Sequence, residues 1–246
     1  MNFHNKTAIV TGASSGFGLE TALLLAEQGA TVFAVARRQG RLLELAEKNP
    51  NIVPVVQDVT QPLDTLAATI AGKRIDILVN NAGLAWGRDP IDTAPRYKWE
   101  TMIDTNIKAL IAVTQLVVPG MIASGGGDIV NIGSIAAFEG YTGGFGYCAT
   151  KFAVRGITES MRHDLFSKNI RVMGIHPGLA ETEFSEVRFD GDKAKAKAVY
   201  AGLNPLTAVD VAETIVWSLS RPRHVNIASL IVMPTDQAAA GVVHRR

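Results

Sequence analysis

Apolar runs of strand length alternate with helix-like segments along most of the chain. The first run, KTAIVTG at 6–12, is followed by a helix-like segment at 16–28 and then by a second run, TVFAVAR. The pattern continues through the runs NIVPVV, IDILVNNAG, GDIVNIGS, IRVMGIHPG and HVNIASLIVMP. Continuous apolar strands separated by helices are typical of a parallel sheet that is covered on both faces. The pattern therefore predicts an α/β protein with a doubly wound, seven-stranded parallel sheet flanked by helices.

One segment interrupts this alternation. Residues 179–202, LAETEFSEVRFDGDKAKAKAVYAG, form a long irregular stretch after the sixth apolar run. Structureless stretches of this length are uncommon inside compact domains unless they serve a site. We expect a small helical substrate-binding lobe or lid there, within a single domain that spans residues 1–246 and is large enough to bury one core.

Composition and charge argue against several partners. The 246 residues carry a formal net charge of +1, without the basic stripe that nucleic-acid binding needs. Cys148 is the single cysteine, and no set of side chains has the spacing of metal ligands. The N-terminal residues MNFHNKTAIV do not resemble a signal peptide, and no uninterrupted apolar run reaches the roughly 18 residues of a membrane span. We expect a soluble, cytoplasmic protein that binds no nucleic acid, membrane or metal.

The first strand ends in TGASSGFG, where three glycines mark the turn into the first helix. Gly12, Gly16 and Gly18 would let the backbone turn sharply and approach a pyrophosphate, which the free amides of a helix N-terminus attract. A glycine turn alone is equally consistent with a plain strand-to-helix connection. Its place in the first unit of a Rossmann-type sheet favours a dinucleotide. The next strand ends at Arg37 and Arg38 instead of an acidic residue, which favours the 2′-phosphate of NADP.

A phenol and an ammonium stand four positions apart in GFGYCATKF. On a helix, Tyr147 and Lys151 share one face and can approach within a few ångströms. An ammonium about 4 Å from a phenol contributes roughly 4 kcal/mol at an effective dielectric of about 20, or about three pKa units before solvation losses. Tyr147 is therefore the candidate acid and base, and Lys151 the group that acidifies it. The spacing alone is weak evidence, because a solvated lysine is common at such a position.

Further motifs along the chain strengthen this interpretation. They are TGASSGFG, Asp58 after the third strand, NNAG at 80–83, Asn106, Ser134, and Tyr147 with Lys151. On these motifs the chain resembles the short-chain dehydrogenase/reductase family over essentially its whole length. The catalytic set that the resemblance implies is Asn106, Ser134, Tyr147 and Lys151. In that family the tyrosine moves the proton, the serine binds the substrate oxygen, the lysine also holds the nicotinamide ribose, and the asparagine braces a water chain.

The same resemblance assigns a cofactor site. Asp58 is expected to contact the adenine, and Asn80 and Gly83 to let the end of the fourth strand approach the cofactor. The residues implied to bind NADP are Gly12, Ser14, Ser15, Gly16, Phe17, Gly18, Arg37, Arg38, Asp58, Val59, Asn80, Ala82, Gly83, Tyr147, Lys151, Pro177, Gly178 and Thr182. Taken singly, several have plainer interpretations, because NNAG is also a good turn and an asparagine within a helix also marks a kink or a cap.

Within the family, the chain is similar to NADP-dependent dehydrogenases of 3-hydroxy acids, a group that also oxidises L-allo-threonine and serine. The similarity lies in NNAGLA, WETMIDTN, PGLAETEFSEVRF and the ending AGVVHRR. The chain departs from that group at ARR (36–38), where alanine replaces glycine, and in a slightly shorter loop after Gly178. We expect hydride exchange between NADP and a 3-hydroxy acid or β-hydroxy amino acid. A reductase of other ketones or aldehydes and a non-catalytic NADP(H) sensor stay open as alternatives.

A hydroxy acid needs a cation for its carboxylate. Arg188, in the irregular segment, is the first candidate and Arg88 the second, although both also fit a plain surface position. The substrate-binding residues that we expect are Ser134, Tyr147 and Arg188. Candidates for the walls of the pocket are Tyr141, Phe145 and Phe184.

The expected helix from about Trp99 to Ala123 is apolar around most of its circumference. Packing on the sheet alone would leave part of that surface in water, so we expect the chain to self-associate. The family resemblance implies a homotetramer, built as a dimer of dimers.

Overall fold

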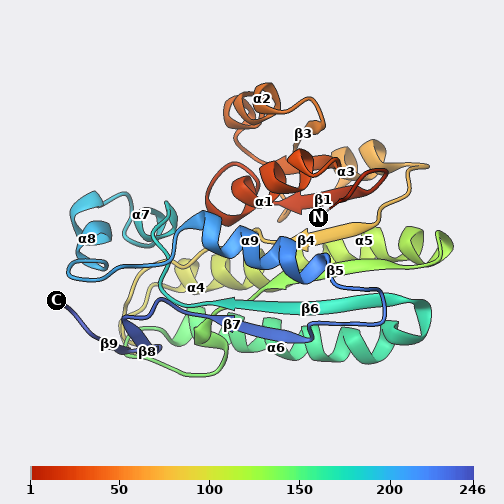
Figure 1. The fold of residues 1–246 in the computed structure, drawn as a ribbon. Coiled ribbons are helices and arrows are strands. Elements are labelled where there is room, and N and C mark those ends of the chain that lie inside the picture. The colour runs from red at the N-terminus through yellow and green to blue at the C-terminus, as the bar shows by residue number, and fades with distance from the viewer. Residues whose placement is uncertain (1) are drawn as a thin grey trace.

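The computed structural model describes residues 2–246 and contains one large parallel sheet (Figure 1). Its strands lie in the order β3-β2-β1-β4-β5-β6-β7, and every neighbouring pair is parallel. The strands are β1 (Thr7–Thr11), β2 (Thr31–Ala36), β3 (Ile52–Val56), β4 (Ile77–Asn80), β5 (Gly127–Ile132), β6 (Ile170–Pro177) and β7 (Ser229–Val232). The doubly wound, seven-stranded sheet predicted from the apolar runs is confirmed.

Helices cover both faces of this sheet. One face packs against α1, α2 and α9, and the other against α3, α5 and α6. The longer helices are α1 (Gly16–Glu27), α2 (Gln39–Lys48), α3 (Asp64–Ile70), α4 (Arg96–Ile103), α5 (Ala109–Ala123), α6 (Phe145–Leu165) and α9 (Ala208–Leu219). Short 3₁₀ turns are η2 (Ile135–Ala137) and η3 (Phe166–Lys168).

Alternation along the strands explains the two helical layers. Ala8 and Val10 of β1 belong to the core under α1, α2 and α9, whereas Ile9 between them belongs to the core under α3, α5 and α6. Each fully buried Ile or Leu contributes roughly 1.5–3 kcal/mol relative to exposure, which favours a strand that is apolar on both faces. Such strands read as continuous apolar runs, as the sequence does here.

The order of the strands places a crevice at one edge of the sheet. β1 pairs with β2 on one side and with β4 on the other, so the connections that follow them run in opposite directions. In open α/β sheets, ligands bind outside the carboxyl ends of the strands at such a switch point. The ends of β1, β2 and β4 therefore mark where a site is expected.

A π-helical turn interrupts the long helix of residues 96–123. The turn η1 (Asp104–Lys108) lies between α4 and α5, where the sequence predicted one regular helix from about Trp99. Such a turn inserts one extra residue into the helix, and π turns are frequent at functional sites. Here it contains the buried Asn106.

The irregular segment 179–202 forms two short helices, α7 (Phe184–Arg188) and α8 (Lys193–Ala198), at the left end of the molecule in Figure 1. Backbone hydrogen bonds from Leu206 N to Leu179 O and from Glu181 N to Leu206 O close the base of this lobe. Next to it, the chain ends in an antiparallel pair, β8 (Gln237–Ala239) and β9 (Val242–Val243), which the apolar pattern did not predict.

Candidate active site

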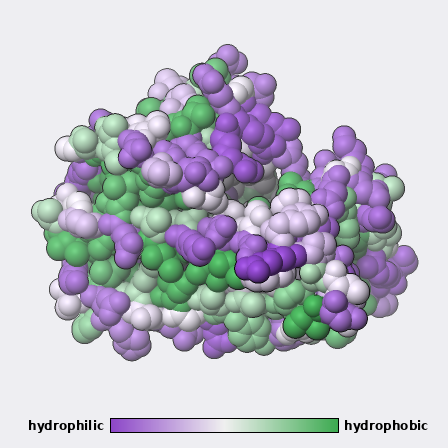
Figure 2. Space-filling view, turned by 180° about the vertical axis from the view of Figure 1, so that it is seen from behind, coloured by the Kyte–Doolittle hydropathy of each residue, from purple (hydrophilic) through white to green (hydrophobic). Residues whose placement is uncertain are grey.

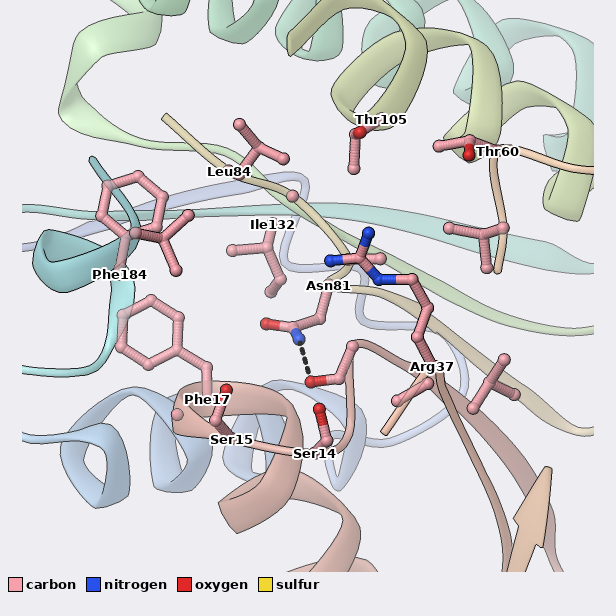
Figure 3. A pocket seen from close by; sticks show the side chains of 18 of the residues that line it. Ser14, Ser15, Phe17, Arg37, Thr60, Asn81, Leu84, Thr105, Ile132 and Phe184 are labelled. Carbon is pink, nitrogen blue, oxygen red and sulfur yellow. Dashed lines mark hydrogen bonds between the residues drawn. The ribbon is translucent and has the colours of Figure 1, made fainter. Parts of the chain in front are cut away.

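A cleft of about 510 Å³ opens at the carboxyl ends of the central strands. Figure 3 shows Ser14, Ser15 and Phe17 from the first turn on one side, with Arg37 towards one end and Phe184 of the lobe towards the other. Of the expected cofactor residues, those that line this cleft are Gly12, Ser14, Ser15, Gly16, Phe17, Arg37, Arg38, Asp58, Val59, Ala82, Gly83, Tyr147, Lys151 and Thr182. Pro177 and Gly178 line an adjoining cavity, and Gly18 and Asn80 line neither of the two.

The glycine turn is shaped by close packing against the end of β4. Gly12 has a φ of +67°, and a Cβ there would lie 2.8 Å from Nδ2 of Asn81. At Gly18 a Cβ would lie 2.4 Å from the same nitrogen and 2.5 Å from the Gly12 carbonyl oxygen. Gly18 thus permits the close approach of α1 to the turn instead of lining the cleft. The turn leaves the N-terminal amides of α1 free for an anion.

At the end of β4, two neighbouring asparagines have different roles. Asn80 is buried, and its amide donates to Oγ1 of Thr114 and Oδ1 of Asn131, both at 2.9 Å, so it joins β4 to α5 and β5. The structure therefore does not bring Asn80 to the cleft. Asn81 lines the cleft instead (Figure 3), and its amide also donates to the Thr11 carbonyl at 2.9 Å. The NNAG motif indicated that this strand end approaches the cofactor, but the sequence did not show which of the two asparagines faces the cleft.

Basic side chains gather where β2 ends. Arg38 donates from Nε to Oγ of Ser14 at 3.0 Å and from Nη2 to Oγ of Ser15 at 2.8 Å. Arg37 is largely exposed, and its Nη1 lies 3.8 Å from Oδ2 of Asp58. Both guanidinium groups line the cleft, and that of Arg38 lies beside two serine hydroxyls; together they form a donor set that suits a phosphate monoester.

The expected catalytic side chains come from three elements. Ser134 follows β5, Tyr147 and Lys151 lie in the first two turns of α6, and Asn106 lies in the π turn. Lys151 is buried and donates to the Ile132 carbonyl at 2.8 Å, and its Nζ lies 5.7 Å from the centroid of the Tyr147 ring. Tyr147 and Lys151 both line the cleft.

Asn106 connects the π turn to two other parts of the site. Its Oδ1 accepts from Leu84 N at 2.8 Å, and its Nδ2 donates to Leu84 O at 2.8 Å and to Thr150 Oγ1 at 2.9 Å. Thr150 in turn donates to the Tyr147 carbonyl at 2.8 Å. Asn106 lines neither cavity, so it fixes the neighbours of the tyrosine from behind.

Burial dominates the electrostatics of the tyrosine and the lysine. Burial lowers the pKa of Lys151 to about 8. Burial raises the pKa of Tyr147, while the Arg188 guanidinium and a hydrogen bond with Ser134 act in the opposite direction. The sequence predicted a lowered phenol pKa caused by Lys151. The structure differs, because desolvation outweighs the nearby charges and the guanidinium of Arg188 is the main acidifying group.

A second cavity of about 140 Å³ adjoins the cleft at Tyr147. Ser134, Tyr141 and Arg188 line it, and Arg188 Nη2 donates to Tyr141 Oη at 2.7 Å. The Nε of Arg188 is buried and has no hydrogen-bond partner in the part of the chain that the structure describes. Arg88 lies on the rim as an exposed side chain, 5.3 Å from the Tyr141 ring centroid.

Sequence patterns missed several residues of this cavity. Tyr200 and Ser185 line it and share a hydrogen bond of 2.6 Å, and Gln237 binds Leu179 N at 2.7 Å. These residues come from the lobe and the C-terminal pair of strands, which carry no periodic pattern. Tyr141 and Phe184 line the cavity as expected walls. The third expected wall residue, Phe145, lies in a separate hollow beside Trp99 and does not line it.

Comparison with known proteins identifies the family. A model of the short chain dehydrogenase family matches residues 6–193. The chain is 44% identical over 245 residues to an NADP-dependent 3-hydroxy acid dehydrogenase of Shigella flexneri, covering 97% of this chain and 99% of that protein. It is 43% identical over 241 residues to a serine 3-dehydrogenase of Rhizobium radiobacter, covering 96% of each.

A solved structure agrees with this assignment. The closed form of a serine dehydrogenase complexed with NADP⁺ matches with a TM-score of 0.92 and 44% identity, covering 98% of this chain and 100% of that one. The chain belongs to the short-chain dehydrogenase family, as its motifs indicated, and it is an oxidoreductase.

Proposed function

We propose that the protein is an NADP-dependent dehydrogenase of small 3-hydroxy acids or β-hydroxy amino acids, of the 3-hydroxypropionate, serine and L-allo-threonine type. The observation that carries this proposal is the Arg188 guanidinium, which shares a cavity with Ser134 and Tyr147. Within residues 2–246, no Asp or Glu lines that cavity. A cation without a counter-ion next to a reactive phenol suits the carboxylate of a substrate. The names of the relatives at 43–44% identity support the same substrate class.

The residues of the cleft suit NADP. The free amides of α1 at Gly16 would receive the pyrophosphate, and Arg37 and Arg38 the 2′-phosphate. Lys151 would hold the nicotinamide ribose, and Thr182 lies at the junction with the second cavity. The nicotinamide supplies or accepts the hydride when it is bound.

Tyr147 handles the proton in this proposal. Since burial raises the pKa of the phenol, it is protonated at neutral pH and can donate to a carbonyl oxygen in the reductive direction. In the oxidative direction the phenol must first release its own proton to solvent; the phenolate then takes the hydroxyl proton, and Arg188 and Ser134 stabilise that anion. Lys151, with a pKa of about 8, exchanges a proton close to neutral pH and is placed beside the same ring.

A substrate panel tests the proposal. We expect NADP reduction with 3-hydroxypropionate, serine or L-allo-threonine, and NADPH oxidation with malonic semialdehyde. The value of kcat/KM for the preferred acid should exceed that of a neutral alcohol of equal size by about tenfold or more, the worth of one charge-assisted contact. A preference for neutral ketones would indicate a general carbonyl reductase. Tight NADPH binding without any turnover would indicate a sensor.

We also propose a cytoplasmic homotetramer of single-domain chains, with 179–202 as the substrate lobe of each. The helical segment Arg96–Ala123, which includes the π turn and is 28 residues long, is apolar and long enough to cross a bilayer, but here it packs on the sheet and against α6. Apolar patches interrupt the polar surface in Figure 2, and exposed apolar side chains include Phe152, Phe166, Trp217 and Ile231. Burial against other copies would remove them from water. Sedimentation that shows only monomer at micromolar concentration would contradict the tetramer.

A further inference from the structure

The short helix α7 carries two side chains of the substrate cavity. Its first residue, Phe184, meets the Tyr147 ring edge-on, with centroids 5.6 Å apart. Its last residue, Arg188, places its guanidinium carbon 5.2 Å from the centroid of the same ring. A helix of five residues has too few internal hydrogen bonds to be stable by itself. Contacts with the rest of the chain must therefore fix the position of Arg188; they include the hydrogen bonds of Ser185 with Tyr200 and of Arg188 with Tyr141, and the contacts at the two ends of the helix.

Glu183 anchors the N-terminal end of α7. Its carboxylate accepts a hydrogen bond of 2.9 Å from Arg38 Nη1 and also pairs with Nη1 of Arg41. Arg38 is itself held by the hydroxyls of Ser14 and Ser15, so this anchor reaches the glycine turn. Burial opposes the charge of the carboxylate, but the two arginines outweigh it and lower the pKa of Glu183. The lobe is thereby tied to the part of the cleft where β2 ends.

Asp190 anchors the other end. Its carboxylate accepts hydrogen bonds from Nε1 of Trp86 and, at 3.3 Å, from Nζ of Lys98. Asp190 adopts a φ of +55°, a conformation that Asp tolerates better than most residues and that turns the chain directly after the helix. The Arg188 carbonyl also accepts from Gly87 N at 2.8 Å. Both ends of α7 are therefore tied to parts of the chain far away in sequence.

We propose that Glu183 is a positioning residue, which holds α7 through Arg38 and Arg41 so that the guanidinium of Arg188 lies in the substrate cavity. This inference deepens the proposed function and rests on it, because Arg188 is taken as the group that binds the substrate carboxylate. The side chains of Glu183, Arg38 and Arg41 are 34%, 45% and 46% exposed. Ion pairs of this kind contribute little to global stability, so removing one loosens the lobe without unfolding the sheet.

Substitution of Glu183 by Gln tests the proposal through substrate selectivity. With NADP saturating, we expect Glu183→Gln to raise KM for a 3-hydroxy acid by about tenfold, because a displaced guanidinium no longer meets the carboxylate. Any fall in kcat that comes from the position of Arg188 beside Tyr147 should be equal for acid and neutral substrates. The kcat/KM for a neutral alcohol of the same size should fall about tenfold less than that for the acid, since the neutral substrate has no carboxylate for the guanidinium to bind. Glu183→Asp keeps the charge and should restore most of the affinity. An unchanged KM, or an equal loss of kcat/KM for acid and neutral substrates, would overturn the proposal.

The matched control is Glu181→Gln. Glu181 is exposed, lies two residues earlier in the same segment, and makes no ion pair among the described residues. Its substitution should leave both substrates unaffected. A KM increase as large as that of the Glu183 variant would show that general charge in the lobe, and not the anchor, is responsible.

Limited proteolysis gives a second readout that needs neither substrate nor cofactor. The lobe exposes Lys193, Lys195 and Lys197 on α8 as trypsin sites. We expect cleavage there to be several-fold faster in Glu183→Gln than in the parent or in Glu181→Gln, because α8 follows a helix that has lost one anchor. Equal cleavage rates would overturn the anchor. If Glu183→Gln is cleaved faster but the parent protein does not oxidise hydroxy acids, the proposed substrate class is wrong and the role of Glu183 as an anchor of α7 is supported.

Discussion

The two halves of the active site are held in place by different forces. The cofactor half consists of strand ends and glycine turns in close contact, and buried groups such as Lys151 and Asn106 hydrogen-bond there to backbone carbonyls. The substrate half consists of α7 and α8, which half-exposed ion pairs of Glu183 and Asp190 attach to the rest. Leaving a buried polar group unpaired is costly, whereas breaking an exposed ion pair is not. Changes in the first half should therefore abolish the reaction, and changes in the second should alter what is bound.

Removal of the phenol should give the largest effect. Tyr147→Phe keeps the aromatic contact with Phe184 but leaves no group to transfer the proton. We expect kcat to fall by about 10³-fold, within the range of a lost general acid or base, while NADPH binding is retained. Steady-state kinetics and a fluorescence titration with NADPH measure the two quantities. A variant that keeps a tenth of the parental kcat would refute the assignment of Tyr147.

The buried histidine His176 should make the stability of the folded protein sensitive to acid. Burial, together with the charges of Lys151 and Arg155, lowers the pKa of His176 from its usual 6.5 to about 4. Between these values the unfolded chain binds a proton that the folded chain does not, so stability should fall as pH drops from about 6.5 to 4 and then level off. The free energy of unfolding should decrease by about 3 kcal/mol over this pH range.

Urea unfolding at several pH values measures this dependence. In His176→Gln, the free energy of unfolding should depend less steeply on pH between 6.5 and 4, because the contribution of this histidine is removed. Replacement of the exposed His163 by Gln serves as the control, and its profile should match that of the parent. An identical slope in the His176 variant would contradict the prediction.

Truncation of Arg188 should show whether this residue or Arg88 binds the substrate carboxylate. We expect Arg188→Ala to raise KM for 3-hydroxy acids by about 30-fold, which corresponds to roughly 2 kcal/mol for a charge-assisted contact. Arg88→Ala, at the exposed rim of the same cavity, should change KM by less than about threefold. Initial rates across a range of acid concentrations decide between the two arginines. The reverse ranking would move the carboxylate site to Arg88.

Salt should produce the smallest effect, and only in the lobe. Raising the ionic strength from about 0.1 M to 1 M shortens the Debye length from about 10 Å to 3 Å and weakens exposed ion pairs. We expect hydrogen exchange of the amides in 184–198 to accelerate about twofold, while amides of β4 and β5 stay unchanged. In Glu183→Gln the salt response of the lobe should be reduced. Equal responses of sheet and lobe would remove the contrast between the halves.

The sequence predicted the sheet well because its information is local. Continuous apolar runs separate strands from helices, and the order of motifs follows the order of strand ends. Such patterns do not distinguish two adjacent residues of the same type. Asn80 and Asn81 are both good turn residues, yet Asn80 joins two strands to a helix and Asn81 lines the cleft. Orientation at a strand end depends on the neighbouring strands, which only the folded chain supplies.

The substrate side was harder to predict, for a different physical reason. Arg188 was chosen for its chemistry, but nothing near it in sequence indicates that Tyr141 accepts its hydrogen bond. The pairing of Glu183 with Arg38 joins residues 145 positions apart. The pKa of Tyr147 was predicted in the wrong direction, because charge was counted and desolvation was not. Long-range pairs and burial are properties of the folded chain and leave no periodic trace in the sequence.

The π turn around Asn106 has a consequence for how the chain can change in length. Because a helix advances by about 100° per residue, the extra residue in η1 sets the orientation of α4 relative to α5. Loss of one residue from 104–108 would rotate either the buried Met102 or the core stripe of Val113 and Val117 away from its partners. A deletion there should therefore disturb the core, whereas a deletion in the lobe at 179–202 should alter which substrate is bound and leave the sheet intact.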